Sequence, residues 1–194
     1  MNSSRLISRL LSRSGVRTPV RTQRLLLRSP EARDVPEIAR LAGDWEVASM
    51  TARIPYPYTV EDARRWLAGL APGEVVLVVE HAGQLVGATG YVPSDDGTSA
   101  EIGYWIGKPF WGRGFATEAA RALIDLAFRD RRIGTLVCCH FADNPASARV
   151  IEKMGFVRTR SCKAWSDARR LDAPSEHYEL KRPVLFSWLR RGAA

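Results

Sequence analysis

The chain has 194 residues, of which 45% are hydrophobic and 26% are charged, and its formal net charge is +8. This size predicts one well-buried domain, and no apolar run approaches the roughly 20 residues that a transmembrane helix requires. The three cysteines have no C-x-x-C spacing and the three histidines are scattered, which argues against a disulfide framework and a metal site and favours a soluble, cytoplasmic protein.

The positive charge is concentrated toward the two ends of the chain. No acidic residue precedes Glu31, and arginines recur at every fourth position, at Arg5, Arg9, Arg13, Arg17 and Arg21. We therefore expect a basic tail over residues 1–20, flexible or helical, a single domain over 21–183, and a second basic tail over 184–194. The first tail is a solvated terminus, a basic amphipathic helix that binds a membrane or an acidic partner, or a transit-peptide-like leader. A basic chain also suits nucleic acid, but no zinc-finger spacing or RNP-like strand is present, so no specific nucleic-acid partner is expected.

Apolar periodicity in the first third of the chain predicts one strand and two helices. Residues 24–29 alternate weakly, which indicates a strand, and residues 29–44 carry the caps and apolar stripe of a helix. Residues 45–58 contain two prolines and predict a long connection or short helical turns. Thr59 and Asp62 have the spacing of a capping box before a helix over 61–70.

The rest of the chain predicts a sheet interrupted by two helices. Residues 75–93 form the clearest hairpin, with Gly83 supplying a positive φ in its turn, and 94–99 form a second turn. Strands are expected over 100–107, 135–141, 156–164 and 175–183, and helices after residue 114 and over 142–155. This order predicts an α+β fold with a mixed, mostly antiparallel sheet.

The run FWGRGFATEAARALIDLAF, residues 110–128, places small residues directly before an apolar-striped helix. Gly112, Gly114 and Ala116 permit tight strand-to-helix packing, which is the structural interpretation. A dinucleotide fingerprint is disfavoured, because Thr117 breaks its spacing. The third interpretation is a diphosphate cradle, in which backbone N–H groups from Gly112 to Thr117 and the positive helix end bind the phosphates and Arg113 adds charge.

Two segments carry a family resemblance: EIGYWIGKPFWGRGFATEAARALI, residues 101–124, and DNPASARVIEKMGF, residues 143–156. Residues 22–182 resemble the GNAT superfamily of acetyl-CoA-dependent N-acetyltransferases, in particular the branch that acetylates ribosomal-protein N-termini. The resemblance implies about six or seven strands with helices on both faces, one N-acetyltransferase domain over 21–183, acetyl-CoA as co-substrate, no metal, and a monomer or homodimer. The family's loop pattern falls on Trp111, Gly114 and Ala116, and Trp111 departs from the usual Gln or Arg.

The resemblance also assigns residues to coenzyme binding. It implies a bulge that separates strand 100–107 from strand 135–141, so that the backbone of Trp105 and Ile106 pairs with the pantetheine arm. Asn144 contacts this arm, although Pro145 follows it and an ordinary helix cap explains it equally well. The residues assigned to coenzyme binding are Trp105, Ile106, Gly112, Arg113, Gly114, Phe115, Ala116, Thr117 and Asn144.

Two residues are the catalytic candidates. Glu101 is the candidate general base, acting through a water, with a solvent-facing strand carboxylate as the alternative. Many family members have a tyrosine at the position of Ile151. Its absence leaves Ser147 to hydrogen-bond or protonate the leaving thiolate, unless that serine is simply part of the first helical turn. Direct attack of the amine in a ternary complex follows from this assignment.

The resemblance implies that the acceptor is a primary amine, with a protein N-terminus, such as that of a ribosomal protein, as the leading candidate. The resemblance places Trp45, Tyr56, Tyr58 and Trp66 along the acceptor groove, although aromatic residues at this spacing also suit a core. Asp44 and Glu46 are candidates to receive a cationic amine, and Tyr178 belongs to the core or the pocket. The alternatives are a small-molecule acceptor such as an aminoglycoside or polyamine, a non-catalytic acyl-CoA-binding regulatory module, and a basic RNA-associated protein.

Overall fold

The structure is a computed structural model that describes residues 19–71 and 73–183. The expected tails therefore lie outside the described residues, apart from the short segment that precedes residue 21. Within the described part of the chain, no helix is both long and apolar enough to cross a membrane.

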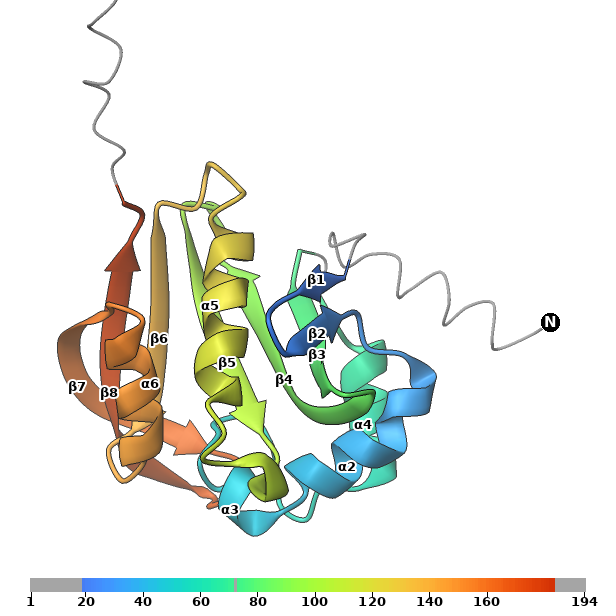
Figure 1. The fold of residues 1–194 in the computed structure, drawn as a ribbon. Helices are drawn as coiled ribbons and strands as arrows, with labels where there is room; N and C mark the ends of the chain where they lie inside the picture. Colours follow the sequence, from blue (N-terminus) through green and yellow to red (C-terminus); the bar gives the residue numbers. More distant parts are fainter. Residues whose placement is uncertain (1–18, 72, 184–194) are drawn as a thin grey trace, which may run out of the picture.

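The described chain contains a mixed sheet and helices on both of its faces (Figure 1). Its strands are β1 (Val20–Arg21), β2 (Leu25–Arg28), β3 (Val75–His81), β4 (Gln84–Pro93), β5 (Ser99–Ile106), β6 (Thr135–Phe141), β7 (Val157–Ser166) and β8 (Leu171–Lys181). Its α-helices are α2 (Val35–Ala42), α3 (Trp45–Ala48), α4 (Val60–Ala68), α5 (Phe115–Ala127) and α6 (Pro145–Lys153), and 3₁₀ turns span Ala32–Asp34 and Lys108–Phe110.

The sheet has eight strands in the order β1-β2-β3-β4-β5-β6-β8-β7. All neighbours pair antiparallel except β5 and β6, which are parallel. The expected α+β class with a mostly antiparallel sheet is confirmed, and the sheet has eight strands where about six or seven were expected. The additional strand, β1, has only two residues, and so short a segment carries no periodic sequence signal.

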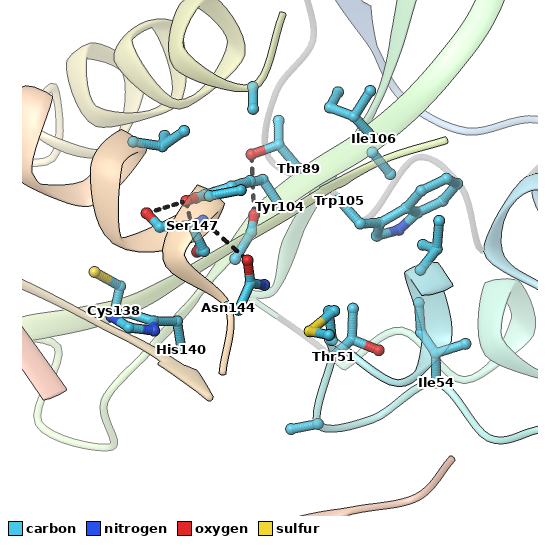
Figure 2. A pocket seen from close by; sticks show the side chains of 18 of the residues that line it. Thr51, Ile54, Thr89, Tyr104, Trp105, Ile106, Cys138, His140, Asn144 and Ser147 are labelled. Atoms are coloured by element: carbon cyan, nitrogen blue, oxygen red, sulfur yellow. Dashed lines mark hydrogen bonds between the residues drawn. The ribbon is translucent and has the colours of Figure 1, made fainter. Parts of the chain in front are cut away.

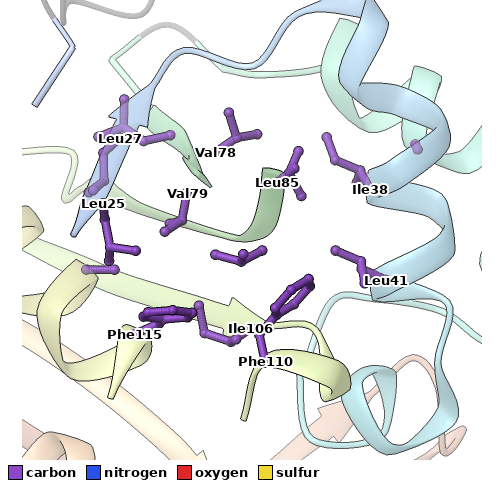
Figure 3. Close-up of a cluster of buried hydrophobic side chains, with 14 of the residues drawn as sticks. Leu25, Leu27, Ile38, Leu41, Val78, Val79, Leu85, Ile106, Phe110 and Phe115 are labelled. Carbon is purple, nitrogen blue, oxygen red and sulfur yellow. The ribbon is translucent and has the colours of Figure 1, made fainter. Parts of the chain in front are cut away.

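Two hydrophobic clusters form the core, and β5 and α5 contribute to both. The first cluster joins α2 and α4 to β2–β4, and Figure 3 shows members of this cluster from β2, β3 and α2, among them Leu27, Val79 and Ile38. All five residues Val75–Val79 are buried, so both faces of β3 are covered. The second cluster packs α5 and α6 against β5, β6 and β8 around Leu123 and Leu136.

Local sequence signals account for two of the element boundaries. The Thr59 side chain accepts a bond from the Asp62 N–H, and the Asp62 carboxylate accepts one from the Thr59 N–H, which confirms the capping box. In the β3–β4 hairpin both turn residues have positive φ, 50° at Ala82 and 79° at Gly83. This geometry matches the right-handed twist of the strands it joins.

Strands β5 and β6 separate soon after they meet. They pair only from Ser99 with Thr135 to Glu101 with Val137, so β5 beyond Glu101 has no partner on that side among the described strands. The expected separation is confirmed. The expected bulge in β5 is wrong, because its pairing with β4 continues without a register shift from Ala100 to Ile106. The strands diverge because the short parallel ladder ends.

Candidate active site

The gap between β5 and β6 opens into a cavity of about 880 Å³, a volume typical of small-molecule sites. The cavity reaches from the loop before α5 to the beginning of α6. The predicted site residues that line it are Glu101, Trp105, Ile106, Gly112, Gly114, Phe115, Ala116, Thr117, Asn144 and Ser147. Arg113 is the exception. Its guanidinium donates to the Pro109 carbonyl at 3.2 Å and lies over the Phe110 ring.

The loop before α5 has an open, small-residue surface. Gly112 and Gly114 have φ of 75° and 78°, a left-handed conformation that other residues rarely adopt. A Cβ on Gly112 would meet no heavy atom within 4 Å. The first amides of any α-helix have no intrahelical acceptor. In α5 the N-cap residue is Gly114, which has no side chain to accept a hydrogen bond from them. The surface can accept an anion.

Arg24 and Glu118 connect this loop to the segment between β1 and β2. The Arg24 Nη1 donates to the Arg113 carbonyl at 2.9 Å, and its Nη2 lies 2.7 Å from the Glu118 carboxylate. Thr22 Oγ1 also donates to Glu118, at 2.6 Å. Although burial opposes ionisation, these hydrogen bonds from Thr22 and Arg24 keep the pKa of Glu118 below its usual value. Glu118 is therefore ionised at neutral pH and anchors β1 and β2 to α5.

Trp111, at the position where the family pattern has Gln or Arg, also holds the loop. Its indole Nε1 donates to the Ile106 carbonyl at 2.6 Å, which ties the loop to the end of β5, and its ring lines the cavity. The role of this side chain follows from the structure alone, because the four residues between Ile106 and Trp111 form a turn that brings the two groups together.

The backbone of β5 alternates between its two neighbours. The Gly107 N–H donates to the Val86 carbonyl, and the Trp105 carbonyl points toward Gly87, so both groups face β4. By antiparallel alternation, the N–H and C=O of Ile106 face away from β4. The C=O accepts the Trp111 indole N–H, which leaves the N–H directed toward the gap. Of the two residues whose backbone was expected to bind the coenzyme, the arrangement supports Ile106. Trp105 contributes its side chain to the cavity wall.

Ser147 occupies the first turn of α6, where Asn144 is the N-cap. The Asn144 Oδ1 accepts the Ser147 N–H at 3.0 Å, so the cap interpretation of this asparagine is confirmed. Figure 2 shows Tyr104 reaching from β5 to Ser147, and its hydroxyl lies 2.9 Å from Ser147 Oγ. Burial raises the pKa of Tyr104 well above its usual value. Ile151, at the position of the family tyrosine, is buried in the core and 2% exposed.

Glu101 and Ser147 approach the cavity from different sides. Along β5, Glu101 and Tyr104 are three positions apart, so their side chains point to opposite faces of the sheet. Glu101 is half exposed, and its carboxylate lies 3.7 Å from the Arg53 guanidinium. Tyr104 points to the face that carries α6 and Ser147. The cavity can therefore place a carboxylate on one side of a bound group and a hydroxyl on the other.

The acceptor residues expected from the sequence are only partly brought together. Trp45, Tyr58, Trp66 and Glu46 line the cavity. Tyr56 stacks edge-on against Trp45 with ring centroids 5.0 Å apart, and the Asp44 carboxylate caps α3 by accepting the Glu46 N–H. Glu46 is also paired with Lys108. Tyr178 is buried in the second core cluster.

Sequence reasoning missed Tyr104 and Arg53. The alternation of β5 can be read from the sequence, and it places Tyr104 on the same face of the sheet as Ile102. The contact of Tyr104 with Ser147 depends on the position of α6, which the sequence does not give. Arg53 lies in the irregular segment before α4, where no periodicity predicts its direction. No group of three or more potential metal-ligating side chains occurs within residues 19–71 and 73–183.

Comparisons with known proteins agree with this geometry. A family model described as an acetyltransferase (GNAT) domain matches residues 24–157. The N-acetyltransferase p20 of Bacillus licheniformis is 27% identical over 157 residues, which cover 76% of this chain and 87% of p20. YkkB of Bacillus subtilis is 36% identical over 89 residues, covering 45% of this chain and 52% of YkkB, so this match spans about half of that relative.

Solved structures share the fold. RimL, a ribosomal L7/L12 α-N-protein acetyltransferase in complex with coenzyme A, has a TM-score of 0.76 and 18% identity, covering 84% of this chain and 98% of RimL. MccE, a microcin C7 self-immunity acetyltransferase in complex with acetyl-CoA and AMP, has a TM-score of 0.73 and 18% identity, covering 89% of this chain and 99% of MccE.

Proposed function

The chain belongs to the GNAT family of acetyl-CoA-dependent N-acetyltransferases, and on that premise we propose that it acetylates the N-terminal amine of a protein. Acetyl-CoA supplies an acetyl thioester; transfer forms a C–N bond to the amine and breaks the C–S bond, releasing the coenzyme thiolate. The observation that carries the proposal is one cavity that joins the anion-accepting loop to Glu101 and Ser147.

The residues present fit the coenzyme. The glycine surface before α5 and the uncapped amides from Gly112 to Thr117 suit a diphosphate, which is doubly charged and accepts several hydrogen bonds. The gap-facing N–H of Ile106 suits a carbonyl of the pantetheine arm or of the thioester, which would lie beside β5 where β6 has left it. Asn144 stands at the far end of this path, beside Ser147.

The catalytic roles follow from the two sides of the cavity. Glu101 removes the proton of the attacking amine, through a water molecule. Only modest help is required, because the reference pKa of an N-terminal amine is about 8. Ser147 donates a hydrogen bond from its hydroxyl to the departing sulfur. The burial of Ile151 supports this assignment, since that side chain is held in the core and has no polar group to offer.

The choice of acceptor is supported by a protein that shares the fold. RimL, whose fold this chain shares, is described as acting on a protein α-amine. A second candidate, a small-molecule amine, is favoured by the aromatic side chains of Trp45, Tyr58 and Trp66 in the cavity wall, because aromatic faces bind organic cations. MccE shows that this fold also accommodates a small nucleotide.

A thiol-release assay with a panel of acceptors separates these candidates. Peptides with free N-termini are compared with the same peptides blocked at the N-terminus but retaining an internal lysine, and with polyamines and aminoglycosides. We expect thiol release and a one-acetyl mass gain only with free N-termini. Acetylation of small amines alone would overturn the acceptor class. Coenzyme binding without release for any amine would identify a non-catalytic module.

The phosphate cradle is tested by Gly114→Glu. The substitution places a carboxylate and a strained left-handed residue at the mouth of the loop, so the affinity for CoA should fall by about 100-fold or more through like-charge repulsion and steric block. Gly97→Glu is the control for added charge and backbone strain, because Gly97 has a positive φ of 69° as well, but lies in the β4–β5 turn, where a Cβ would meet no heavy atom within 4 Å; a Cβ on Gly114 would lie 3.4 Å from Arg24 Nη2. Calorimetric titration with CoA gives the result, and normal binding by Gly114→Glu would remove the cradle.

A further inference from the structure

The Tyr104 hydroxyl is the only side-chain partner recorded for Ser147 Oγ among the described residues. The two oxygens are 2.9 Å apart, and the Tyr104 hydroxyl also has a longer hydrogen-bond contact, 3.4 Å, to the Ser147 carbonyl oxygen, which is a second acceptor for the phenol proton. The Ser147 N–H is engaged by Asn144, which fixes the backbone from which the hydroxyl projects. The serine side chain is therefore held between a phenol on one side and the open cavity on the other (Figure 2).

The direction of the hydrogen bond between the two hydroxyls determines what Ser147 offers to the cavity. Each hydroxyl has one proton to donate. If Ser147 donates to Tyr104, its proton points away from a bound ligand. If Tyr104 donates to Ser147 Oγ, which is its shorter contact, and not to the Ser147 carbonyl, the serine proton is free to point into the cavity. A developing thiolate accepts hydrogen bonds strongly, so it favours the second arrangement.

We propose that Tyr104 is a positioning residue, whose hydroxyl donates to Ser147 Oγ and so directs the serine proton at the sulfur of bound coenzyme A. This rests on the proposed function, in which Ser147 faces the leaving sulfur. The phenol on β5 therefore provides a hydroxyl group next to Ser147. The buried Ile151 side chain on α6 has no polar group to provide there.

The phenol keeps its own proton throughout. Because burial raises the pKa of Tyr104, a tyrosinate is disfavoured at neutral pH, and the hydroxyl remains a donor. Ser147 correspondingly keeps its proton and stabilises the thiolate as a hydrogen-bond donor, while solvent supplies the proton that finally reaches the sulfur. No bond to either oxygen is made or broken.

The test compares binding of CoA with binding of desulfo-CoA, which lacks the thiol, as the pH is raised through the thiol pKa of about 8.5. In the wild-type protein we expect CoA to gain about tenfold in affinity over desulfo-CoA, because a hydrogen bond to a charged acceptor favours the thiolate. Tyr104→Phe and Ser147→Ala should each remove most of this gain. The double variant should lose no more than either single variant, because the two groups act as one unit.

Tyr178→Phe is the matched control. Tyr178 is a buried tyrosine on the neighbouring part of the sheet, and its hydroxyl lies 3.2 Å from His140 Nε2 instead of Ser147. Its removal should leave the gain intact. Tyr104→Phe preserves the ring that fills the site, and thermal unfolding of each variant monitors the fold.

The outcomes are distinguishable from failure of the proposed function. A Tyr104→Phe protein that keeps the wild-type gain overturns the inference, as does an additive double variant or a wild-type protein without thiolate preference. Failure of the proposed acceptor class appears separately, as absent acetylation of free N-termini in the assay above. In an active enzyme, Tyr104→Phe should lower kcat about tenfold and leave the KM for acetyl-CoA nearly unchanged.

Discussion

At the scale of single residues, β5 divides the chemistry between the two faces of the sheet. On one face, Glu101 supplies a carboxylate beside Arg53. On the other face, the Tyr104 hydroxyl contacts Ser147 Oγ. The split follows from the two-residue period of a strand. A single shift of register would exchange these side chains, so the unbroken pairing of β5 with β4 fixes the site as well as the fold.

The role of Glu101 can be measured through its pH dependence. If Glu101 removes a proton from the amine, Glu101→Gln should lower kcat about 10- to 100-fold near neutral pH. The loss should shrink as the pH passes the acceptor amine's pKa of about 8, because the neutral amine then predominates without help. Rates of acetylation of one peptide across pH give this profile.

Glu179→Gln controls for a simple loss of charge. Glu179 lies on β8 opposite Val137, which in turn pairs with Glu101, so both carboxylates project from the same face of the sheet. The control should retain the wild-type profile. A loss at Glu101→Gln that is independent of pH would contradict a base and indicate a binding role.

At the scale of elements, the N-terminus of α5 depends on strands that precede it by about ninety residues in the chain, through Arg24 and Glu118. A carboxylate in the first turn also interacts favourably with the positive end of the helix. The same helix end is proposed to bind the coenzyme, so Glu118 connects the stability of the β1–β2 segment to the shape of the loop.

Glu118 should make stability depend on acid pH. Its pKa in the folded protein lies below the reference value of 4.5, so its contribution is fully present above that value and is lost as the pH falls through the lower folded pKa. Glu118→Gln should reduce the free energy of unfolding at neutral pH by about 1–2 kcal/mol, and the difference should vanish in stronger acid. Denaturant unfolding at several pH values measures it.

Glu61→Gln is the comparison for that measurement. Glu61 pairs with Arg64 at 3.3 Å, but both side chains are 64% exposed, so its removal should change stability by less than about 0.5 kcal/mol. An equal effect of the two substitutions, or a Glu118 effect that persists in acid, would contradict the anchoring role.

At the scale of the whole molecule, the two core clusters are joined because β5 and α5 contribute to each. The only parallel pairing in the described sheet is short, and the cavity separates the strands beyond it. Continuity of the core therefore depends on shared side-chain packing more than on the β5–β6 ladder. We expect the two clusters to unfold as one cooperative unit.

Paired truncations test this cooperativity. Leu77 belongs to the first cluster and Leu136 to the second, and both are 0% exposed, so each Leu→Ala change should cost about 2–5 kcal/mol. Each should shift one common transition, seen at the same denaturant concentration by tryptophan fluorescence and circular dichroism. Leu171→Ala, at 48% exposure, should have little effect. Separate transitions for the two probes would show that the clusters unfold independently.

The sequence by itself located the main elements and the small-residue loop. Hydrophobic periodicity located seven strands, Thr59 with Asp62 marked the start of α4, and small residues marked the loop before α5, because such signals act over a few neighbouring residues. The resemblance added Glu101, Ser147 and Asn144, and the structure brings all three to one cavity.

Only the tertiary structure decided how distant residues meet. The Tyr104–Ser147 contact joins residues 43 positions apart, Arg24 reaches Glu118 across 94 positions, and Arg53 approaches Glu101 from an irregular segment. The continuous register of β5 likewise replaced the expected bulge. These facts depend on strand order and helix placement, which arise from packing of the whole core and leave no local pattern in the chain.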